Sequence, residues 1–227
     1  MAQVAVVTGA FGALGRVVAH AAVEAGYEVA ALDFAAAPAP GLDPKVMPLG
    51  GVDLADPSQA LSAIEAVLVR FGRIDALFNI AGGFAWETIA DGSIAAWERL
   101  HRLNLLTALN ASKAALPHLV AAGGGAIVNV GANAALKAGV GMGAYAASKA
   151  GVARLTESLA QELAKQDITV NAVLPSIIDT PTNRADMPDA DRATWVTPHA
   201  LAEVIMFLLS PSSRAISGAL IPVTRGG

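Results

Sequence analysis

The chain has 227 residues, of which 54% are hydrophobic and 15% charged, and its formal net charge is −4. This composition excludes a disordered chain, and the length suits one sizeable core. The absence of cysteine excludes disulfides and thiol catalysis, and with only 4 histidines it excludes a Cys/His metal cage. No basic block, membrane-length apolar run or secretory pattern is present, so we expect a cytoplasmic protein that binds neither nucleic acid nor membrane.

Short apolar or β-branched runs alternate with longer helical patterns along the chain. In chain order they predict strands at 4–8, 29–33, 46–52, 74–80, 126–130, 168–174 and 219–223, and helices at 14–25, 57–71, 93–120, 143–164 and 199–209. Such alternation produces a parallel sheet with helices on both faces. The sequence therefore predicts an α/β fold, a single Rossmann-type doubly wound domain over 1–227 with about seven parallel strands and ligands at their C-terminal ends.

The segment between the first strand and the first helix carries three glycines, Gly9, Gly12 and Gly15. Residues without side chains let the backbone approach a pyrophosphate, and the start of the following helix offers free N–H groups to it. The strand-to-helix context therefore favours a dinucleotide site. A tight turn that needs only Gly9 at positive φ would also fit.

Asp33 ends the second predicted strand, and its carboxylate can accept hydrogen bonds from an adenosine ribose. The same charge would repel a 2′-phosphate, and no Arg or Lys stands at positions 10, 11 or 34 to offset it. The sequence therefore predicts NADH rather than NADPH as the cofactor. The alternative is a strand-end carboxylate that only faces solvent.

Tyr145 and Lys149 lie four residues apart in a predicted helix and so share one face. A free phenol has a pKa near ~10, and a neighbouring cation favours the phenolate and lowers that value. The pair therefore indicates a general acid, Tyr145, with Lys149 as its partner. An incidental pair on an amphipathic helix is the alternative.

Taken together, these residues resemble the short-chain dehydrogenases/reductases. Further matches follow in the family's order along nearly the whole chain, namely Asp53, Asn79-Ile80-Ala81-Gly82, Asn104, Leu174-Pro175 and the segment 218–223. The resemblance implies that Lys149 also binds the nicotinamide ribose and that Asn104 holds a water in a proton relay, although Asn104 could instead be a polar residue in a kinked helix. The cofactor-binding residues that it implies are Gly9, Phe11, Gly12, Ala13, Leu14, Gly15, Asp33, Phe34, Asp53, Leu54, Ala81, Gly82, Gly83, Tyr145, Lys149, Pro175, Ile178 and Thr180.

Two departures from the family pattern bear on the substrate. The family usually has a serine 13 residues before its tyrosine, where this chain has Ala132, and Ile80 replaces a second asparagine. An alanine cannot donate to a developing alkoxide, and loss of one such donor typically costs on the order of 10²–10³ in rate. The enzyme is therefore impaired, or its substrate is not an ordinary ketone.

The dihydropteridine reductase branch of the family is similar to this chain at 12–15, 81–84, 131–136, 179–184 and 187–191. The resemblance implies reduction of a quinonoid dihydropterin by NADH without that serine. A long loop usually has a function, so the segment 176–198 is expected to form a substrate lid. Phe84, Trp86 and Trp195 are candidates to stack on a flat heterocycle, with ordinary packing as the alternative.

Three hypotheses for the function follow. The first is an NADH-dependent reductase of quinonoid dihydropterin, a small-molecule substrate, that uses Tyr145, Lys149 and Asn104. The second is a carbonyl reductase or alcohol dehydrogenase in which Asn133 replaces the serine's donor. The third is a non-catalytic NAD-sensing or scaffold protein, which would not need a phenol. The resemblance also implies a homodimer, or a tetramer, through the helices 93–120 and 143–164, and no metal is expected.

Overall fold

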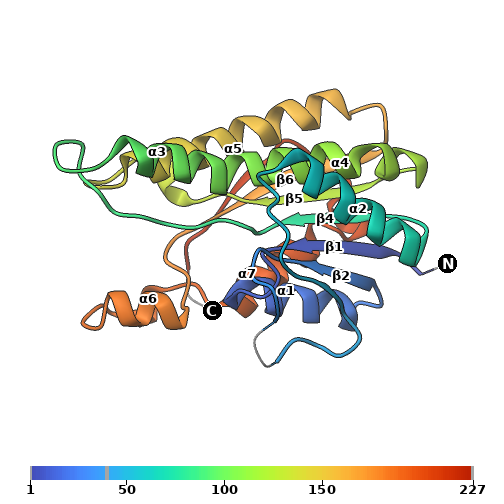
Figure 1. Cartoon of the computed structure of the whole chain (residues 1–227), viewed down its shortest axis with the longest axis horizontal. Coiled ribbons are helices and arrows are strands. Elements are labelled where there is room, and N and C mark those ends of the chain that lie inside the picture. The colour runs from blue at the N-terminus through green and yellow to red at the C-terminus, as the bar shows by residue number, and fades with distance from the viewer. Residues whose placement is uncertain (1, 39–40, 226–227) are drawn as a thin grey trace.

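The computed structural model describes residues 2–38 and 41–225, which form a parallel sheet between two layers of helices (Figure 1). The strand order in this part of the chain is β3-β2-β1-β4-β5-β6-β7, and every neighbouring pair is parallel. The strands are β1 (Val4–Thr8), β2 (Glu28–Leu32), β3 (Met47–Leu49), β4 (Ala76–Asn79), β5 (Gly125–Val130), β6 (Ile168–Pro175) and β7 (Leu220–Val223). The main helices are α1 (Ala13–Glu24), α2 (Pro57–Phe71), α3 (Ile94–His101), α4 (Thr107–Ala121), α5 (Gly143–Glu162), α6 (Pro181–Asp186) and α7 (Pro198–Phe207).

The strands are apolar at consecutive positions because both faces of the sheet are covered. Along β1, Val4 and Val6 join the core on the side of α2, α4 and α5, whereas Ala5 and Val7 join the core on the side of α1 and α7. Successive side chains of a strand point to opposite faces, so an unbroken apolar run buries both. The predicted doubly wound α/β fold is confirmed.

The predicted boundaries of α2 match the structure because its end signals are local. Asp56 accepts a hydrogen bond from the Ser58 backbone N–H, Pro57 stands in the first turn, and Gly72 ends the helix at φ 80°. An acidic N-cap satisfies a free N–H group, and glycine adopts the left-handed cap conformation without steric cost. The crossover from β3 to β4 is thereby specified by a few neighbouring residues.

Some predicted segments differ from the structure, and the strand predicted over 46–52 is shorter, at Met47–Leu49. The helix predicted over 93–120 is interrupted by a π-helical turn at Arg102–Leu106, between α3 and α4. Asn104 lies in this turn and bonds to the backbone of Gly83, a residue distant in sequence, which is a contact that local periodicity does not reveal. The predicted loop after β6 contains the short helix α6, and residues 39–40, between the strands predicted at 29–33 and 46–52, lie outside the described part of the chain.

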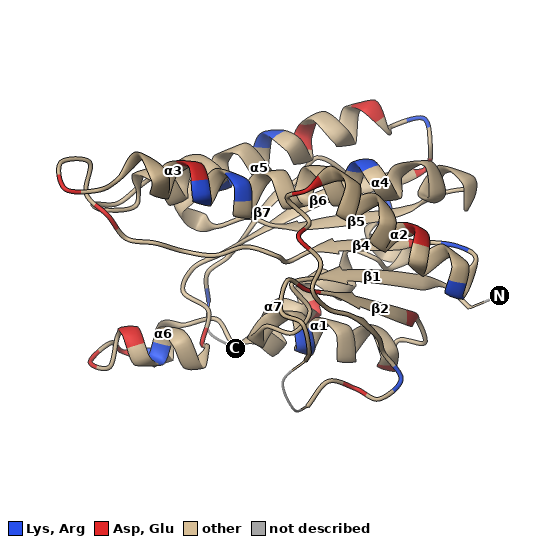
Figure 2. Cartoon of the chain, viewed as in Figure 1, with Lys and Arg blue, Asp and Glu red and all other residues tan. Residues whose placement is uncertain are grey.

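The outer faces of the helices carry charges of both signs. Figure 2 shows basic and acidic residues interspersed along α3 and α5. Across residues 2–38 and 41–225, no helix combines the length and apolarity needed to cross a bilayer. The same residues contain no group of three or more His, Asp or Glu side chains arranged to hold a metal ion.

Candidate active site

The two halves of the sheet meet at β1 and β4. The chain adds β2 and β3 beyond β1, and it adds β5, β6 and β7 beyond β4, so the strand order reverses between them. Doubly wound sheets bind ligands at the C-terminal ends of the strands at this point. A cleft of about 1420 Å³ opens there, lined by residues from the turns after β1, β2, β4, β5 and β6. All the residues predicted from the sequence to be catalytic or to bind the cofactor line it except Asn104, which is buried.

The glycine turn after β1 leaves no room for side chains. Gly9 has φ 63°, and a Cβ placed on it would lie 2.8 Å from the backbone of Ala81. A Cβ on Gly15 would lie 2.2 Å from the carbonyl oxygen of Gly9. Both glycines are therefore required for the turn itself and for its close approach to the end of β4.

The N-terminus of α1 offers backbone donors to the cleft. Its first cap position is Gly12, and no side chain caps the helix there, whereas Asp56 caps α2 and Ser93 caps α3. The first N–H groups of a helix have no partner within the helix, and together with the helix dipole they attract an anion. The turn therefore fits the diphosphate of a dinucleotide such as NADH.

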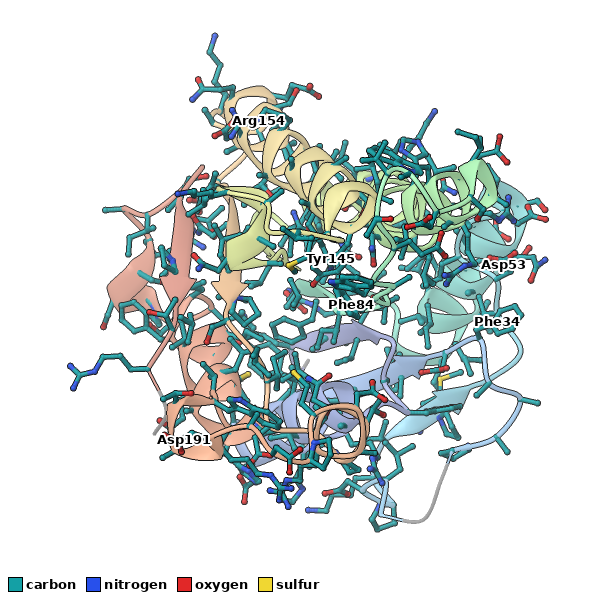
Figure 3. The ribbon with its side chains drawn as sticks, turned by 90° about the vertical axis from the view of Figure 1, so that its left-hand side faces the viewer. Phe34, Asp53, Phe84, Tyr145, Arg154 and Asp191 are labelled. Atoms are coloured by element: carbon teal, nitrogen blue, oxygen red, sulfur yellow. The ribbon has the colours of Figure 1, made fainter. Side chains whose placement is uncertain are left out.

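Asp33 follows β2 and lines the cleft there. Its carboxylate accepts hydrogen bonds from the backbone N–H groups of Phe11 and Ala35, each at 2.9 Å. A carboxylate has about four lone-pair sites, so these two bonds leave acceptors for ribose hydroxyls. Phe34, 76% exposed, stands beside it as part of the cleft wall (Figure 3). The carboxylate thus places a negative charge and free acceptor sites at this part of the cleft.

Asp53, which follows β3 and lines the cleft, is paired with the π-helical turn. Its carboxylate accepts a hydrogen bond from the Ala55 N–H at 2.9 Å and pairs with the Arg102 guanidinium at 2.7 Å. Arg102 also lines the cleft, and the sequence analysis did not single it out. No local motif indicates this pair, because its members are 49 positions apart.

Tyr145 and Lys149 both reach the cleft from α5, but the lysine does not lower the pKa of the phenol as predicted. The Tyr145 ring meets the Phe84 ring edge-on, with centroids 5.0 Å apart (Figure 3). Burial raises the pKa of Tyr145 to about 12 and lowers the pKa of Lys149 to about 8. The Lys149 Nζ donates to the carbonyl oxygen of Val130 at 2.7 Å. Desolvation therefore determines the direction of both pKa shifts. The prediction that Lys149 lowers the pKa of Tyr145 is wrong.

Asn104 lies beneath the cleft and joins three segments. Its Oδ1 accepts from the Gly83 N–H at 2.8 Å, and its Nδ2 donates to the Gly83 carbonyl at 3.1 Å and to the Ser148 hydroxyl at 2.9 Å. The Ser148 hydroxyl in turn donates to the Tyr145 carbonyl at 2.7 Å. Both amide hydrogens of Asn104 are thus engaged, so its predicted water relay would have to use an acceptor atom. Ser148 was missed, although its place between Tyr145 and Lys149 could have indicated it.

The substrate end of the cleft is bounded by loops. Phe84 and Trp86, each more than half exposed, line it together with Ala132 and Asn133. The predicted stacking role of Trp195 is wrong, because that side chain is only 3% exposed and does not line the cleft. Two of the three candidate aromatic residues therefore remain available to a ligand.

The segment after β6 forms a flap beside this end of the cleft. Its base is held by a bridge between Ile178 and Val196 and by two Arg184–Asp179 contacts of 2.6 and 2.7 Å. Helix α6 projects from the body of the protein on this flap (Figure 1), and Asn183 and Met187 on it line the cleft. The flap thus borders the cleft as the predicted lid would.

Comparison with known proteins identifies the family. The profile described as "short chain dehydrogenase" matches residues 3–191. The chain belongs to this family. Its members are oxidoreductases that use NAD(H) or NADP(H), so the cleft described above is the place where this chain would hold such a nucleotide.

The relatives act on chemically different substrates. The chain is 31% identical to the 3-oxoacyl-[acyl-carrier-protein] reductase FabG of Thermotoga maritima, over 99% of this chain and 97% of the relative. It is 28% identical to the D-beta-hydroxybutyrate dehydrogenase of Rhizobium meliloti, over 96% and 87%. The ligand-free aldohexose dehydrogenase of Thermoplasma acidophilum superposes with a TM-score of 0.88 at 27% identity, over 98% of this chain and 92% of that structure. The family is thereby established, and its members share the fold while they differ in substrate.

Proposed function

We propose that this short-chain dehydrogenase is an NADH-dependent reductase whose acceptor is a flat conjugated heterocycle, a quinonoid dihydropterin. The observation that carries the proposal is the composition of the substrate end of the cleft. Ala132 stands where the family usually places a hydroxyl donor, and the aromatic rings of Phe84 and Trp86 line the same cavity. Such a site has lost a carbonyl clamp and retains surfaces for stacking.

The residues at the other end of the cleft support NADH as the reductant. The uncapped start of α1 and the glycine turn would hold the diphosphate, and Asp33 would accept the ribose hydroxyls and repel a 2′-phosphate. When bound, NADH supplies a hydride to the acceptor. The side chains of Tyr145 and Lys149, which line the cleft, would lie at the nicotinamide end.

Tyr145 suits the direction of reduction. Because burial raises the pKa of its phenol to about 12, the group is protonated at neutral pH and can donate to an acceptor nitrogen as that atom becomes basic. The Lys149 bond to Val130 holds α5 against the end of β5, and the bonds of Asn104 to Ser148 and Gly83 link α5 to the turn after β4, which positions the phenol.

The second candidate is a carbonyl reductase or alcohol dehydrogenase. The names of the relatives favour it, since the reductase of Thermotoga maritima and the D-threitol dehydrogenase of Mycolicibacterium smegmatis, 31% identical over 99% of this chain, act on carbonyl or alcohol groups. In that case Asn133, which also lines the cleft, would supply the missing donor. Chemistry at a carbonyl would then depend on an amide rather than on a serine.

An acceptor screen tests the choice. Oxidation of NADH is followed by the loss of its near-ultraviolet absorbance, with quinonoid dihydropterin and with a panel of 3-oxo acids, 3-oxo thioesters and sugar ketones. We expect kcat/KM for the pterin to exceed the best ketone at least about tenfold. Efficient reduction of a ketone with no pterin turnover would contradict the proposal, and Asn133 would become the residue to mutate.

A homodimer through α4 and α5 and a cytoplasmic location complete the proposal. Leu109 on α4 is 37% exposed, and Ala147 on α5 is an exposed small residue that would allow close helix packing. Charges of both signs flank this face on α5 (Figure 2). We expect two copies to associate there.

A further inference from the structure

One buried hydroxyl in the cleft has no hydrogen-bond partner. Three buried side-chain atoms in the described part of the chain lack a partner, namely Asn79 Oδ1, Ser176 Oγ and Ser210 Oγ. Of these residues only Ser176 lines the cleft. Buried polar atoms nearly always have a hydrogen-bond partner, so each exception needs an explanation. A ligand bound in the cleft could supply the missing partner of Ser176, but not those of the other two residues, which do not line the cleft.

Ser176 lies at the sheet edge where the usual serine is missing. It follows the last residue of β6, and its backbone N–H donates to the Val223 carbonyl at 3.1 Å, which fixes the start of the flap. The register pairs Val130 of β5 with Val173 of β6, and the Gly131 N–H still bonds to the Val173 carbonyl. The same register, continued past the strands, sets position 132 level with position 175, one residue before Ser176.

We propose that the Ser176 hydroxyl is a second hydrogen-bond donor to the acceptor atom that receives the proton of Tyr145, in place of the donor lost at Ala132. The inference rests on the proposed reductase function. The residue is partly exposed and lines the cleft while its Oγ is buried, so the inference requires the side chain to adopt another χ1 rotamer when the acceptor binds. Its unpaired state leaves no existing bond to break.

Two other hydroxyls near this end of the cleft already take part in hydrogen bonds. Ser148 Oγ donates to the Tyr145 carbonyl, and Thr180 Oγ1 accepts from the Asn183 N–H at the start of α6. Among the cleft-lining residues that the structure describes, Ser176 is thus the one with a side-chain hydroxyl oxygen that is both buried and unpaired. In this proposal, the hydrogen bond that the family's serine usually donates from the residues after β5 is donated instead by Ser176, directly after β6.

Three variants test the inference: Ser176→Ala, the matched control Ser210→Ala, and the double variant Ala132→Ser/Ser176→Ala. Ser210 is the other buried unpaired hydroxyl, and it does not line the cleft. The readouts are kcat and KM with quinonoid dihydropterin and with the ketone panel, the Kd of NADH by fluorescence titration, and Tm. These readouts separate an effect on the acceptor from an effect on the cofactor or on folding.

We expect Ser176→Ala to lower kcat/KM for the acceptor at least about tenfold, with the Kd of NADH within about twofold of wild type and no loss of Tm. Ser210→Ala should leave kinetics unchanged, and the added Ala132→Ser substitution in the double variant should restore part of the rate. Wild-type turnover in Ser176→Ala, or equal losses of Tm and rate in both single variants, would overturn the inference and leave the reductase proposal standing. A wild-type chain that oxidises NADH with neither class of acceptor would overturn both.

Discussion

The two ends of the cleft are built differently. At the cofactor end, the turn after β1 and the end of β4 approach so closely that Gly9 and Gly15 admit no Cβ, and Asp33 is held by two backbone N–H groups. At the substrate end the wall consists of loops, and the Phe84 and Trp86 side chains remain more than half exposed. The shape of the cofactor end is therefore set by the ends of packed strands, whereas the shape of the substrate end is set by the loops that connect helices and strands.

This difference teaches where substrate specificity resides in the fold. Loops on a rigid scaffold accept changes of side chain that the ends of packed strands do not. This tolerance of loops agrees with the comparisons. Relatives near 30% identity cover nearly the whole chain and yet carry the names of different substrates. The cofactor end should therefore respond to substitution with losses of NADH binding, and the substrate end with losses confined to the acceptor.

The largest effect is expected for Lys149→Met, which should abolish most turnover and weaken NADH binding, yet stabilise the protein. Burial lowers the pKa of Lys149 to about 8 in the folded protein, from an ordinary 10.5. Below pH 8 the buried group is charged, and the full cost of burying this charge is then subtracted from the free energy of unfolding. Between pH 8 and 10.5 the folded protein has released the Lys149 proton while the unfolded chain still holds it, so the free energy of unfolding of the wild type rises with pH. Urea unfolding at pH 7 should show a gain of roughly 1–2 kcal/mol that shrinks toward pH 10.

Lys113→Met is the matched control for that experiment, since Lys113 is an exposed lysine on α4. It should change neither turnover nor the pH dependence of stability. A Lys149→Met protein that is less stable than wild type at pH 7 would show that the Val130 hydrogen bond outweighs the desolvation of the ammonium.

Asp33→Asn sharpens the comparison at the cofactor end. Wild type should bind NADH at least about tenfold more tightly than NADPH, because the carboxylate repels a 2′-phosphate. The amide keeps an oxygen acceptor for the Phe11 or Ala35 N–H while it removes the charge, so the preference should fall to less than about threefold. Fluorescence titration of both nucleotides measures it, with Asp186→Asn on the exposed flap as control. Equal wild-type affinities would refute the role of Asp33.

At the substrate end, Gly141→Ala should act through Trp86. Gly141 has φ 74°, and a Cβ there would lie 2.1 Å from the Trp86 ring. The control is Gly26→Ala, because Gly26 has a similar φ of 89° and open space around its Cβ. Both should lose about 1 kcal/mol of stability from backbone strain, but only Gly141→Ala should raise KM for the acceptor severalfold. The same KM in both variants would exclude Trp86 from the acceptor site.

The smallest effect on catalysis is expected from the proposed dimer interface. Light scattering at micromolar concentration should give the mass of two chains, and Ala147→Glu on α5 should convert the protein to monomers. Leu61→Glu, at an exposed residue on α2, should leave the dimer intact. A monomeric wild type would refute the dimer.

Most of the fold could be predicted from the sequence because its signals are local. Apolar runs identify the strands, and Asp56 and Gly72 bound α2. The π-helical turn could not be predicted, since it accompanies a bond between Asn104 and Gly83, 21 positions apart. Pattern and spacing alone carry no information about such a tertiary contact.

In the site, motif spacing brought together the glycine turn, Asp33, Tyr145 and Lys149, all of which line one cleft. The direction of the Tyr145 pKa was missed because it depends on burial, which the sequence does not report at a single position. Trp195 was misplaced for the same reason. Long-range pairing and desolvation therefore account for the failures.

The measurement that tests the central claim most directly compares wild type with Tyr145→Phe, with saturating NADH and quinonoid dihydropterin, in single-turnover oxidation of NADH. The substitution removes the phenolic proton and retains the ring that meets Phe84 edge-on. We predict a rate lower by about 10²-fold or more with the Kd of NADH nearly unchanged, because the phenol acts mainly in the proton-transfer transition state. A Tyr145→Phe protein that oxidises NADH as fast as wild type would contradict the account.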